Sequence, residues 1–231
     1  LAAPLRVQLG ERPHRQLSAA VGSMMRLAEG KRWFLAGNDY CWPRVVHAAA
    51  RNVVTEKSGV VVGEAFAPLG SRDFSLLIDR VVASRPDVVL SSFVGADLVN
   101  FERQCHARGV RETSRSLALA LDEPTRERIG DRACIGMWGV SGYFEQLDVE
   151  ENRDFLRRYR GAYGPLATPV SSISESVYET VHLYAAAARR VRSDDPAHVA
   201  RELRGGSFDF PRGTVTMDAT GEAGQRMYLA E

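Results

Sequence analysis

The chain has 231 residues, of which 45% are hydrophobic, 26% charged and 8% aromatic, and its formal net charge is +1. This composition is typical of a globular protein and excludes collagen, low-complexity disorder and a disulfide miniprotein. Basic and acidic residues are nearly balanced without a visible basic cluster, which argues against direct binding of nucleic acid. The sequence contains no run of about 18 apolar residues, so no segment is expected to insert into a membrane.

The chain ends and the cysteines are the features of the sequence that relate to the cellular compartment of the protein. The sequence starts at Leu1 rather than at a methionine and finishes on the strand-like run 227–230, so we expect the natural protein to extend further. The missing signal peptide therefore decides nothing. Three cysteines without C-x-x-C spacing argue against a disulfide framework and against a zinc site, so we expect no metal. Free thiols mildly favour a reducing compartment.

Short apolar runs alternate with amphipathic segments along the whole chain. In chain order, the patterns predict a helix over 17–29, a strand over 33–37, a helix over 43–58, a strand over 60–62, a helix over 73–84, a strand over 87–92, a helix over 96–108, strands over 117–121 and 135–143, helices over 150–163, 171–192 and 196–204, and a strand over 213–218. Strands that alternate with helices of ten or more residues predict βαβ units. The expected fold class is α/β, with mostly parallel sheets flanked by helices.

The positions that follow the strands are the first place to look for a site. In parallel sheets, ligands bind at the carboxyl ends of strands near a topological switch point. The segment 37–44 stands out because it places two large aromatic residues, Tyr40 and Trp42, where a strand ends. Such rings can close around a small ligand, and their O–H or N–H can orient it. The alternative is that both rings cap the core under the loop.

Catalytic signatures are missing from the sequence. It contains no G-x-S-x-G, Walker A or H-E-x-x-H motif, and no G-x-G-x-x-G follows a predicted strand, so we expect no dinucleotide or other cofactor. The five histidines lie in or near predicted helices, and we interpret each as a surface or packing residue. Polar residues at strand ends have no histidine alongside in this interpretation. We therefore expect no catalytic residue, with an enzyme on this sheet as a minor alternative.

The turn Asp39-Tyr40-Cys41-Trp42-Pro43-Arg44 resembles the type I periplasmic binding protein superfamily. Within it, the turn is most similar to the branch of urea receptors of ABC transporters and of the short-chain-amide sensor of an amidase operon. This branch is related to the leucine/isoleucine/valine-binding proteins. The resemblance continues through Pro68-Leu69-Gly70, Asp73-Phe74, Pro86-Asp87-Val88-Val89, Tyr143-Phe144, Asp148, Glu151-Asn152, Phe155, Tyr163-Gly164, Ser207-Phe208-Asp209 and Gly213-Thr214-Val215-Thr216.

The resemblance implies two Rossmann-like lobes with the ligand between them. Residues 1–30 and 145–204 would form a remnant of lobe one, and residues 31–144 and 205–231 would form lobe two, with approximate boundaries. The first half of lobe one would lie upstream of Leu1, so the first lobe would be incomplete. The isolated chain would then bind urea or acetamide poorly.

The resemblance also implies a set of ligand-binding residues, namely Tyr40, Trp42, Gly95, Glu123 and Tyr143. The carboxylate of Glu123 could accept the N–H groups of an amide or urea; the alternative is an ordinary acid at a helix N-terminus. For Tyr143 the alternative is packing at a hinge.

Two charged residues of the turn have expectations of their own. We expect Asp39 to cap the helix that starts at Pro43 rather than to contact a ligand. Arg44 lies in the first helical turn, which is unfavourable for a cation, so we expect it to reach a carboxylate.

These features predict a solute-binding protein that closes on a small polar ligand (urea, a short-chain amide or an amino-acid-like molecule). Its partner would be the permease of an ABC transporter, and its location would be extracytoplasmic. The alternative is a cytoplasmic amide- or amino-acid-sensing domain of a transcription or signalling protein, acting on a regulatory partner. A third possibility is an interaction module that has lost its pocket.

Overall fold

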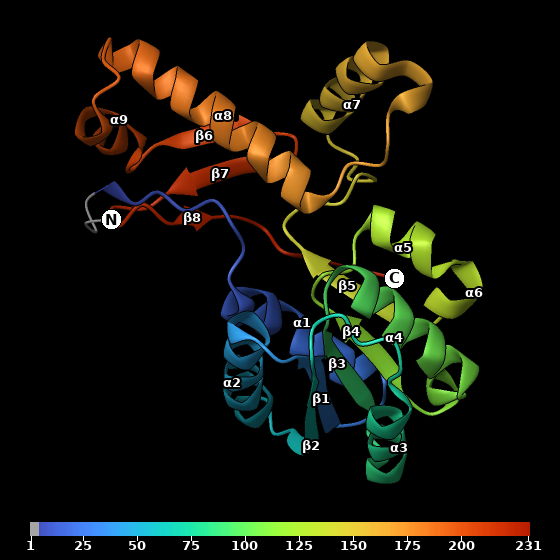
Figure 1. Ribbon diagram of the computed structural model, residues 1–231. Coiled ribbons are helices and arrows are strands. Elements are labelled where there is room, and N and C mark those ends of the chain that lie inside the picture. The colour runs from blue at the N-terminus through green and yellow to red at the C-terminus, as the bar shows by residue number, and fades with distance from the viewer. Residues whose placement is uncertain (1–4) are drawn as a thin grey trace. The chain divides into compact units, whose positions relative to one another are not determined.

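The computed structural model describes residues 5–231 (Figure 1). The chain forms two compact units. Unit 1 contains the described residues up to Glu11 together with Gly142–Arg226, and unit 2 contains Arg12–Ser141 and Met227–Glu231. Three connections therefore join the units, at residues 11/12, 141/142 and 226/227.

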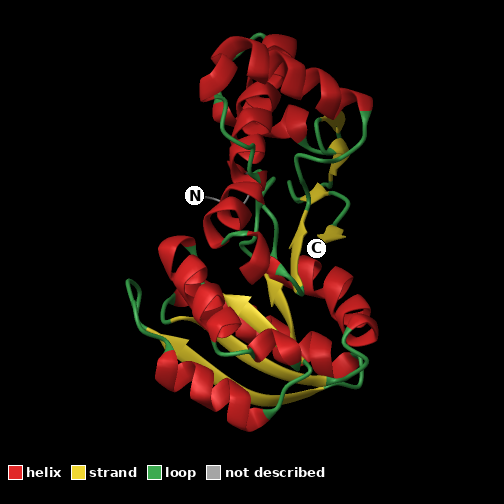
Figure 2. Ribbon diagram, turned by 90° about the vertical axis from the view of Figure 1, so that its right-hand side faces the viewer, coloured by secondary structure: helices red, strands yellow, loops and turns green. Residues whose placement is uncertain are grey.

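Unit 2 is built on a six-stranded sheet with the order β2-β1-β3-β4-β5-β9 (Figures 1 and 2). The strands are β1 (Arg32–Asn38), β2 (Val60–Ala67), β3 (Val88–Ser92), β4 (Arg115–Ala118), β5 (Met137–Ser141) and β9 (Tyr228–Ala230). The first five are parallel, and β9 pairs antiparallel with β5. The predicted α/β class with a mostly parallel sheet is confirmed.

Helices cover both faces of this sheet, which explains why its strands are apolar runs rather than alternating patterns. The helices are α1 (Pro13–Leu27), α2 (Cys41–Glu56), α3 (Ser75–Ser84), α4 (Gly95–Ala107), α5 (Glu123–Ile129) and α6 (Asp131–Cys134), with a short 3-10 turn, η2 (Val110–Glu112). Alternate side chains of β1 point to opposite faces. Trp33 and Leu35 pack in one core with α1 and α2, whereas Phe34 and Ala36 pack in the other with α3 and α4.

Unit 1 combines helices with a three-stranded antiparallel sheet of order β6-β7-β8. Its elements are α7 (Glu150–Tyr163), the 3-10 turn η3 (Gly164–Leu166), α8 (Ser172–Val191), α9 (Pro196–Leu203), β6 (Ser207–Phe210), β7 (Gly213–Met217) and β8 (Ala223–Gly224). Helix α9 begins as its sequence predicts: the Asp195 carboxylate accepts from the N–H groups of Ala197 and His198 at 2.9 and 3.1 Å, and Pro196 occupies the first turn.

The two units divide the chain differently from the expected lobes in two places. Helix α1, expected in lobe one, belongs to unit 2, because Leu17 and Val21 pack in the same core as Trp33. Strands β6 to β8, expected in lobe two, belong to unit 1, because Val215 of β7 packs in one core with Leu183 of α8. Of the C-terminal segment, only residues 227–231 join unit 2.

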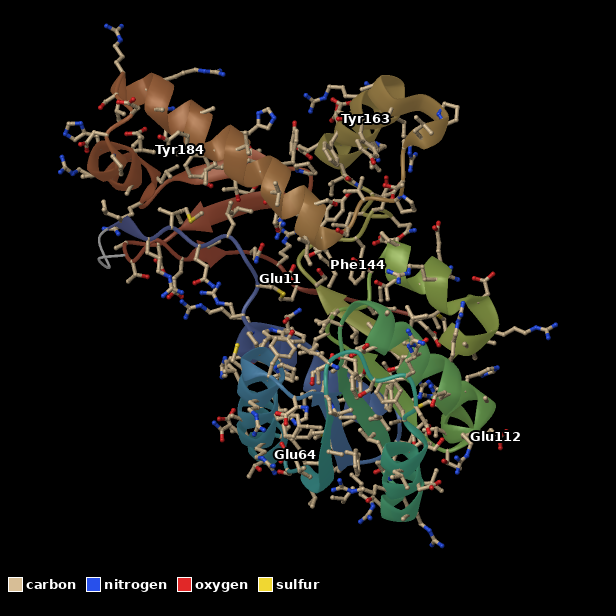
Figure 3. The ribbon with its side chains drawn as sticks, viewed as in Figure 1. Glu11, Glu64, Glu112, Phe144, Tyr163 and Tyr184 are labelled. Carbon is tan, nitrogen blue, oxygen red and sulfur yellow. The ribbon has the colours of Figure 1, made fainter. Side chains whose placement is uncertain are left out.

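Helix α8 carries an apolar stripe on an open face. Ile173, Val177 and Val181 recur every four residues and are 74%, 60% and 62% exposed. Tyr184 continues the stripe, and the exposed Tyr163 ends α7 (Figure 3). Contiguous exposed apolar surface marks a contact surface. In the described part of the chain, no helix is both long and apolar enough to cross a membrane.

Candidate functional site

The carboxyl ends of the unit 2 strands bring three turns together. The strand order has a switch point between β1 and β3, because β1 continues into α2 on one face and β3 continues into α4 on the other. In doubly wound sheets, ligands bind in the crevice at this point. We call the turns 39–42, 93–97 and 119–123 the strand-end surface. It holds four of the five residues that the resemblance implies.

Tyr40 and Trp42 lie side by side where β1 passes into α2. Their rings stack with centroids 6.4 Å apart and an interplanar angle of 28°. Both side chains are half-buried, and Trp42 packs against the core that α1 and α2 share with β1. Burial raises the pKa of the Tyr40 hydroxyl, and the neighbouring Cys41 adds to the shift. The two rings thus pack partly on the core while keeping part of their surface accessible.

The charged residues of this turn pair with each other. The Arg44 guanidinium donates from Nε and Nη2 to Asp39 Oδ1 at 3.0 and 2.5 Å, which confirms that Arg44 reaches a carboxylate. It also lies 4.9 Å from the centre of the Phe66 ring. The expectation that Asp39 caps the helix is wrong, because Tyr40 occupies the N-cap position and no side chain caps it. Arg44 is therefore already paired within its own turn.

A buried hydrogen-bond network fixes the turns around the switch point. The Asn38 side chain accepts from the Val94 N–H at 3.1 Å and donates to Asp97 Oδ2 at 2.7 Å. The same Asp97 oxygen accepts from the Gly70 N–H at 2.8 Å. Asn38 is fully buried and Asp97 nearly so. The turns after β1, β2 and β3 are thereby linked by two side chains, which sequence reasoning missed although both lie in segments that follow strands.

Gly95 and Glu123 each open a helix on this surface. Gly95 begins α4 with φ of +56°, and a Cβ there would meet no atom within 4 Å, so the glycine is needed for its backbone conformation while its surroundings are open. The first N–H groups of a helix have no intrahelical acceptor. Glu123 is the first residue of α5, next to the N-cap Asp122, whose carboxylate accepts from the Thr125 N–H at 3.0 Å. Its position fits an acid at a helix N-terminus.

Tyr143 lies in unit 1 and not on the strand-end surface. Its side chain is fully buried among Phe155, Leu156 and Val170. Its hydroxyl donates to Asn152 Oδ1 at 2.9 Å. This environment matches the packing alternative, and it gives the side chain no accessible surface for a ligand.

One strand-end serine does have a histidine alongside, contrary to the sequence interpretation. His47 Nε2 is 3.0 Å from Ser92 Oγ, and His47 Nδ1 is 2.9 Å from an oxygen of Glu64 on β2, which is labelled in Figure 3. Ser92 Oγ also donates to the Ala36 carbonyl at 3.1 Å. Ser92 and His47 are 0% and 1% exposed, so no substrate can reach the pair. The three residues follow the order of a serine–histidine–carboxylate triad, but the serine and the histidine are buried. Their hydrogen bonds hold α2 against the sheet.

The burial of His47 predicts a pH-dependent stability. Desolvation lowers the pKa of His47 below 6.5, although the hydrogen bond that His47 Nδ1 makes to the Glu64 carboxylate acts in the opposite direction. The unfolded chain therefore takes up a proton at this residue at higher pH than the folded chain does. The stability that His47 contributes is complete above its unfolded pKa of 6.5 and is lost as the pH falls through the folded pKa.

We expect the unfolding free energy of the wild type to fall below pH 6.5 by up to about 1.4 kcal/mol per pH unit more than that of His47→Gln. Urea denaturation of both proteins between about pH 5 and about pH 8 measures the difference in slope. Parallel curves below pH 6.5 would show that His47 keeps its proton affinity on folding.

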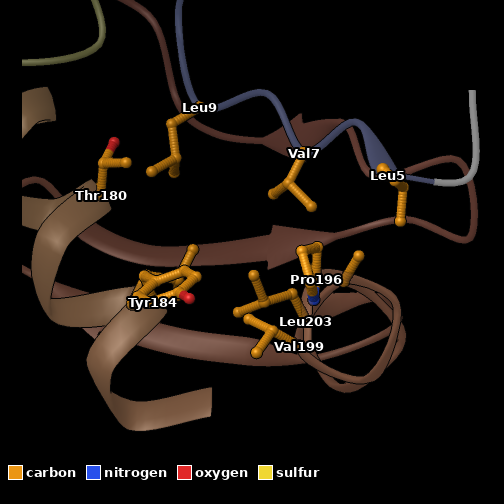
Figure 4. A pocket seen from close by; sticks show the side chains of 10 residues that line it. Leu5, Val7, Leu9, Thr180, Tyr184, Pro196, Val199 and Leu203 are labelled. Carbon is orange, nitrogen blue, oxygen red and sulfur yellow. The ribbon is translucent and has the colours of Figure 1, made fainter. Parts of the chain in front are cut away.

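The described residues of unit 1 line at least two cavities. One, of about 210 Å³, is lined by Val7, Thr180, Tyr184, Val199 and other apolar residues (Figure 4). It is smaller than ordinary ligand pockets and mostly apolar. The other, of about 360 Å³, lies between α7 and α8 and is lined largely by rings, with Arg158 at its side. Its aromatic residues are Phe155, Tyr159, Tyr163 and Tyr178.

Among the described residues, no group of three or more His, Cys, Asp and Glu side chains is placed so that it could hold a metal ion. The cysteines Cys41, Cys105 and Cys134 are all free, and only Cys41 is exposed.

The comparison with protein families identifies this chain's similarity along nearly its whole length. The family model described as "Periplasmic binding protein" matches residues 3–231. Among curated proteins, a limonene hydroxylase from Geobacillus stearothermophilus is 29% identical over 91 residues, which is 39% of this chain and 17% of that protein.

Solved structures of similar fold agree closely with the chain. An amino acid ABC transporter substrate-binding protein from Pseudomonas fluorescens Pf-5 has a TM-score of 0.87, 21% identity and 94% of this chain covered. A periplasmic binding protein from Burkholderia mallei has a TM-score of 0.88, 23% identity and 99% coverage. A solute-binding protein from R. palustris, in complex with 4-hydroxybenzoate, has a TM-score of 0.85, 22% identity and 94% coverage. The chain spans 58%, 60% and 60% of these three proteins, respectively.

Proposed function

This chain belongs to the periplasmic binding protein family, and from that premise we propose that it binds a small polar solute through the strand-end surface. The observation that carries the proposal is the switch point between β1 and β3, where the half-buried rings of Tyr40 and Trp42 lie near the open turn at Gly95. The proposed partner is the permease of an ABC transporter, and the proposed location is extracytoplasmic. No catalytic residue is part of the proposal.

The proposed ligand is a neutral amide or urea. A ligand carbonyl would accept from the first N–H groups of α4, and ligand N–H groups would donate to the carboxylate of Glu123. Arg44 is paired with Asp39 and does not serve a ligand carboxylate. A tryptophan side chain carries about 200 Å² of surface, so Trp42 leaves little room for the side chain of a branched amino acid.

The size of such a ligand limits its affinity. Acetamide and urea have four heavy atoms, and the best small ligands gain about 1.5 kcal/mol per atom. Four atoms then give about 6 kcal/mol, so the dissociation constant should be no tighter than roughly tens of micromolar.

A thermal-shift screen of the full-length protein against urea, acetamide, butyramide, leucine and valine tests the proposal. We expect a concentration-dependent rise in melting temperature with urea or acetamide and none with leucine or valine. A rise with leucine alone would contradict the amide proposal and favour an amino-acid receptor.

Replacing Trp42 with glycine should widen the range of amides that bind. The smaller residue removes steric bulk from the strand-end surface, so butyramide should gain affinity relative to acetamide by about tenfold, equivalent to about 1.4 kcal/mol. Calorimetric titration measures both ligands. Trp138→Phe is the matched control, because Trp138 packs in the same core from β5 and away from the turn. An unchanged ratio of butyramide to acetamide affinity in Trp42→Gly would show that Trp42 does not line the proposed pocket.

A regulatory role in the cytoplasm is the alternative, and the free thiols are the observation that favours it. Cys41 is exposed and adjoins the proposed site. Labelling of Cys41 by a membrane-impermeant maleimide in spheroplasts would place the protein outside the cytoplasmic membrane. Labelling only after lysis would favour the sensor.

A further inference from the structure

The Asp97 carboxylate is buried at the strand-end surface, and its hydrogen bonds come from neutral groups. The residue is 6% exposed, and it accepts from the Asn38 amide at 2.7 Å and from the Gly70 N–H at 2.8 Å. The ion pairs among the described residues do not include Asp97. The nearby Asp39, by contrast, is paired with Arg44. No cation among the described residues pairs with the Asp97 carboxylate, and its hydrogen-bond donors are two neutral N–H groups.

The position of this charge gives it a role toward a ligand. Asp97 is the third residue of α4, and its partners lie in the turns after β1 and β2. The amino end of a helix carries a partial positive charge of about half an elementary charge, which would otherwise attract anions. The full negative charge of a carboxylate buried in the first turn is larger than this partial positive charge. An incoming carboxylate then meets repulsion that burial strengthens, whereas an amide of the same shape does not.

We propose that Asp97 determines specificity at this site by excluding carboxylates, so that the strand-end surface selects neutral amides and ureas. The inference rests on the proposed function, because it concerns the ligand of that site. Asn38 is the positioning residue: its amide group fixes the carboxylate, and its carbonyl oxygen accepts from Val94 N–H just before α4 begins. Neither residue needs to touch the ligand, since the effect of Asp97 acts through its charge.

Acetamide and acetate are the probes, because they have the same shape and number of heavy atoms and differ in charge. Calorimetric or NMR titration of the full-length wild type should show acetamide bound at least about tenfold more tightly than acetate, equivalent to about 1.4 kcal/mol. In Asp97→Asn the ratio should fall by at least about threefold, because the introduced side chain keeps a carbonyl oxygen that can accept from both donors while the charge of Asp97 is gone. The preference that remains would come from the carboxylate of Glu123. The affinity for acetamide should change little.

Three further variants separate charge from folding. Asp79→Asn removes the same charge from an exposed residue of α3 that pairs with Arg108, and it should leave the ratio at its wild-type value. The exchange Asn38→Asp with Asp97→Asn moves the carboxylate from position 97 to position 38, the position of its hydrogen-bond partner. In the exchange, the carboxylate introduced at position 38 can accept from Val94 N–H and from the amide introduced at position 97, whose carbonyl oxygen can accept from Gly70 N–H. This protein should keep the preference for acetamide, whereas Asn38→Asp alone places two carboxylates together and should melt at a lower temperature than the exchange.

The outcomes distinguish the two proposals. A lowered ratio in Asp97→Asn with a wild-type ratio in Asp79→Asn and in the exchange supports the inference. Wild type that binds acetamide and acetate equally, or Asp97→Asn that keeps the full preference, overturns the inference and leaves amide binding in place. Binding of neither probe nor urea by the folded wild type overturns the proposed amide ligand and this inference with it.

Discussion

Replacing Arg212 with methionine should lower the free energy of unfolding by about 3 to 5 kcal/mol, because it leaves buried carboxylates without their cation. Arg212 is 3% exposed, and Glu175 and Glu179 of α8 are fully buried. The guanidinium donates from Nε to Glu179 at 3.1 Å, and Nη2 donates to Glu175 and to Ser176. Burial, together with the neighbouring Glu175, raises the pKa of Glu179 well above its ordinary value of 4.5.

The loss should depend on pH and on the neighbouring acids. Without the cation, folding favours the protonated carboxyl groups, so the stability of Arg212→Met should fall as the pH rises above the unfolded value of 4.5. Urea denaturation at about pH 5 and about pH 8 should therefore show the larger loss at the higher pH. Adding Glu175→Met and Glu179→Leu should recover at least half of it. Arg157→Met, at an exposed ion pair with Asp154, is the control and should cost about 0.5 kcal/mol or less. A loss in Arg212→Met no larger than in this control would contradict the assignment.

The Arg212 cluster also gathers the unit 1 ends of all three connections between the units. Arg212 donates to Gln225, which in turn donates to the Leu9 carbonyl at 3.1 Å. The Gly142 N–H donates to Glu11 at 2.6 Å, and Arg212 lies 4.0 Å from the same Glu11 oxygen. Residues 11, 142 and 225 lie at or next to the three connections. Arg212→Met should therefore disturb unit 1 at the points where the chain leaves it.

Replacing Gly37 with alanine should destabilise the protein by about 2 to 3 kcal/mol, through a clash in the core below the strand-end surface. A Cβ at this position would lie 2.1 Å from Ser92 Oγ, 3.1 Å from Pro43 Cβ and 3.2 Å from His47 Nε2. The serine cannot simply turn away, because its hydroxyl is held by His47 and by the Ala36 carbonyl. Thermal and urea denaturation measure the loss.

A double-mutant cycle attributes this loss to the serine. Gly37→Ala with Ser92→Ala removes the nearest atom of the clash, so the two changes together should cost at least about 1 kcal/mol less than the sum of the single changes. Gly161→Ala is the matched control: it lies in α7 with no atom within 4 Å of the added Cβ, and it should raise stability by about 0.5 to 1 kcal/mol. Additive losses in the cycle would mean that the strain lies in the backbone and not at Ser92.

Local patterns in the sequence were enough to predict the strands and the longer helices of unit 2 and the turn after β1, but not the short helices α5 and α6. The apolar run 33–37 lies within β1, and the predicted helix over 43–58 corresponds to α2, which begins two residues earlier, at Cys41. Periodicity does not say which core an amphipathic helix joins. Helix α1 has an apolar face that fits either lobe, and only its packing with Trp33 assigns it to unit 2.

The polar contacts of the candidate site could not be derived in the same way. Asn38 and Asp97 are 59 residues apart, and His47 and Ser92 are 45 residues apart. Each pair meets because neighbouring parallel strands bring their ends to one edge of the sheet, with partners chosen by side-chain geometry. A sequence shows that polar residues follow strands, but it does not show which of them is buried. The same limit applies to Tyr143, whose hydroxyl partner Asn152 lies inside unit 1.

The most direct test of the central claim is a nitrogen-15 NMR titration of the full-length protein with acetamide. The account expects saturable shifts in the amide signals of residues 39–42, 93–97 and 119–123 and in the indole signal of Trp42. Saturable shifts confined to the ring-lined cavity of Phe155, Tyr159 and Tyr178 would contradict it, as would the absence of any saturable shift with acetamide or urea.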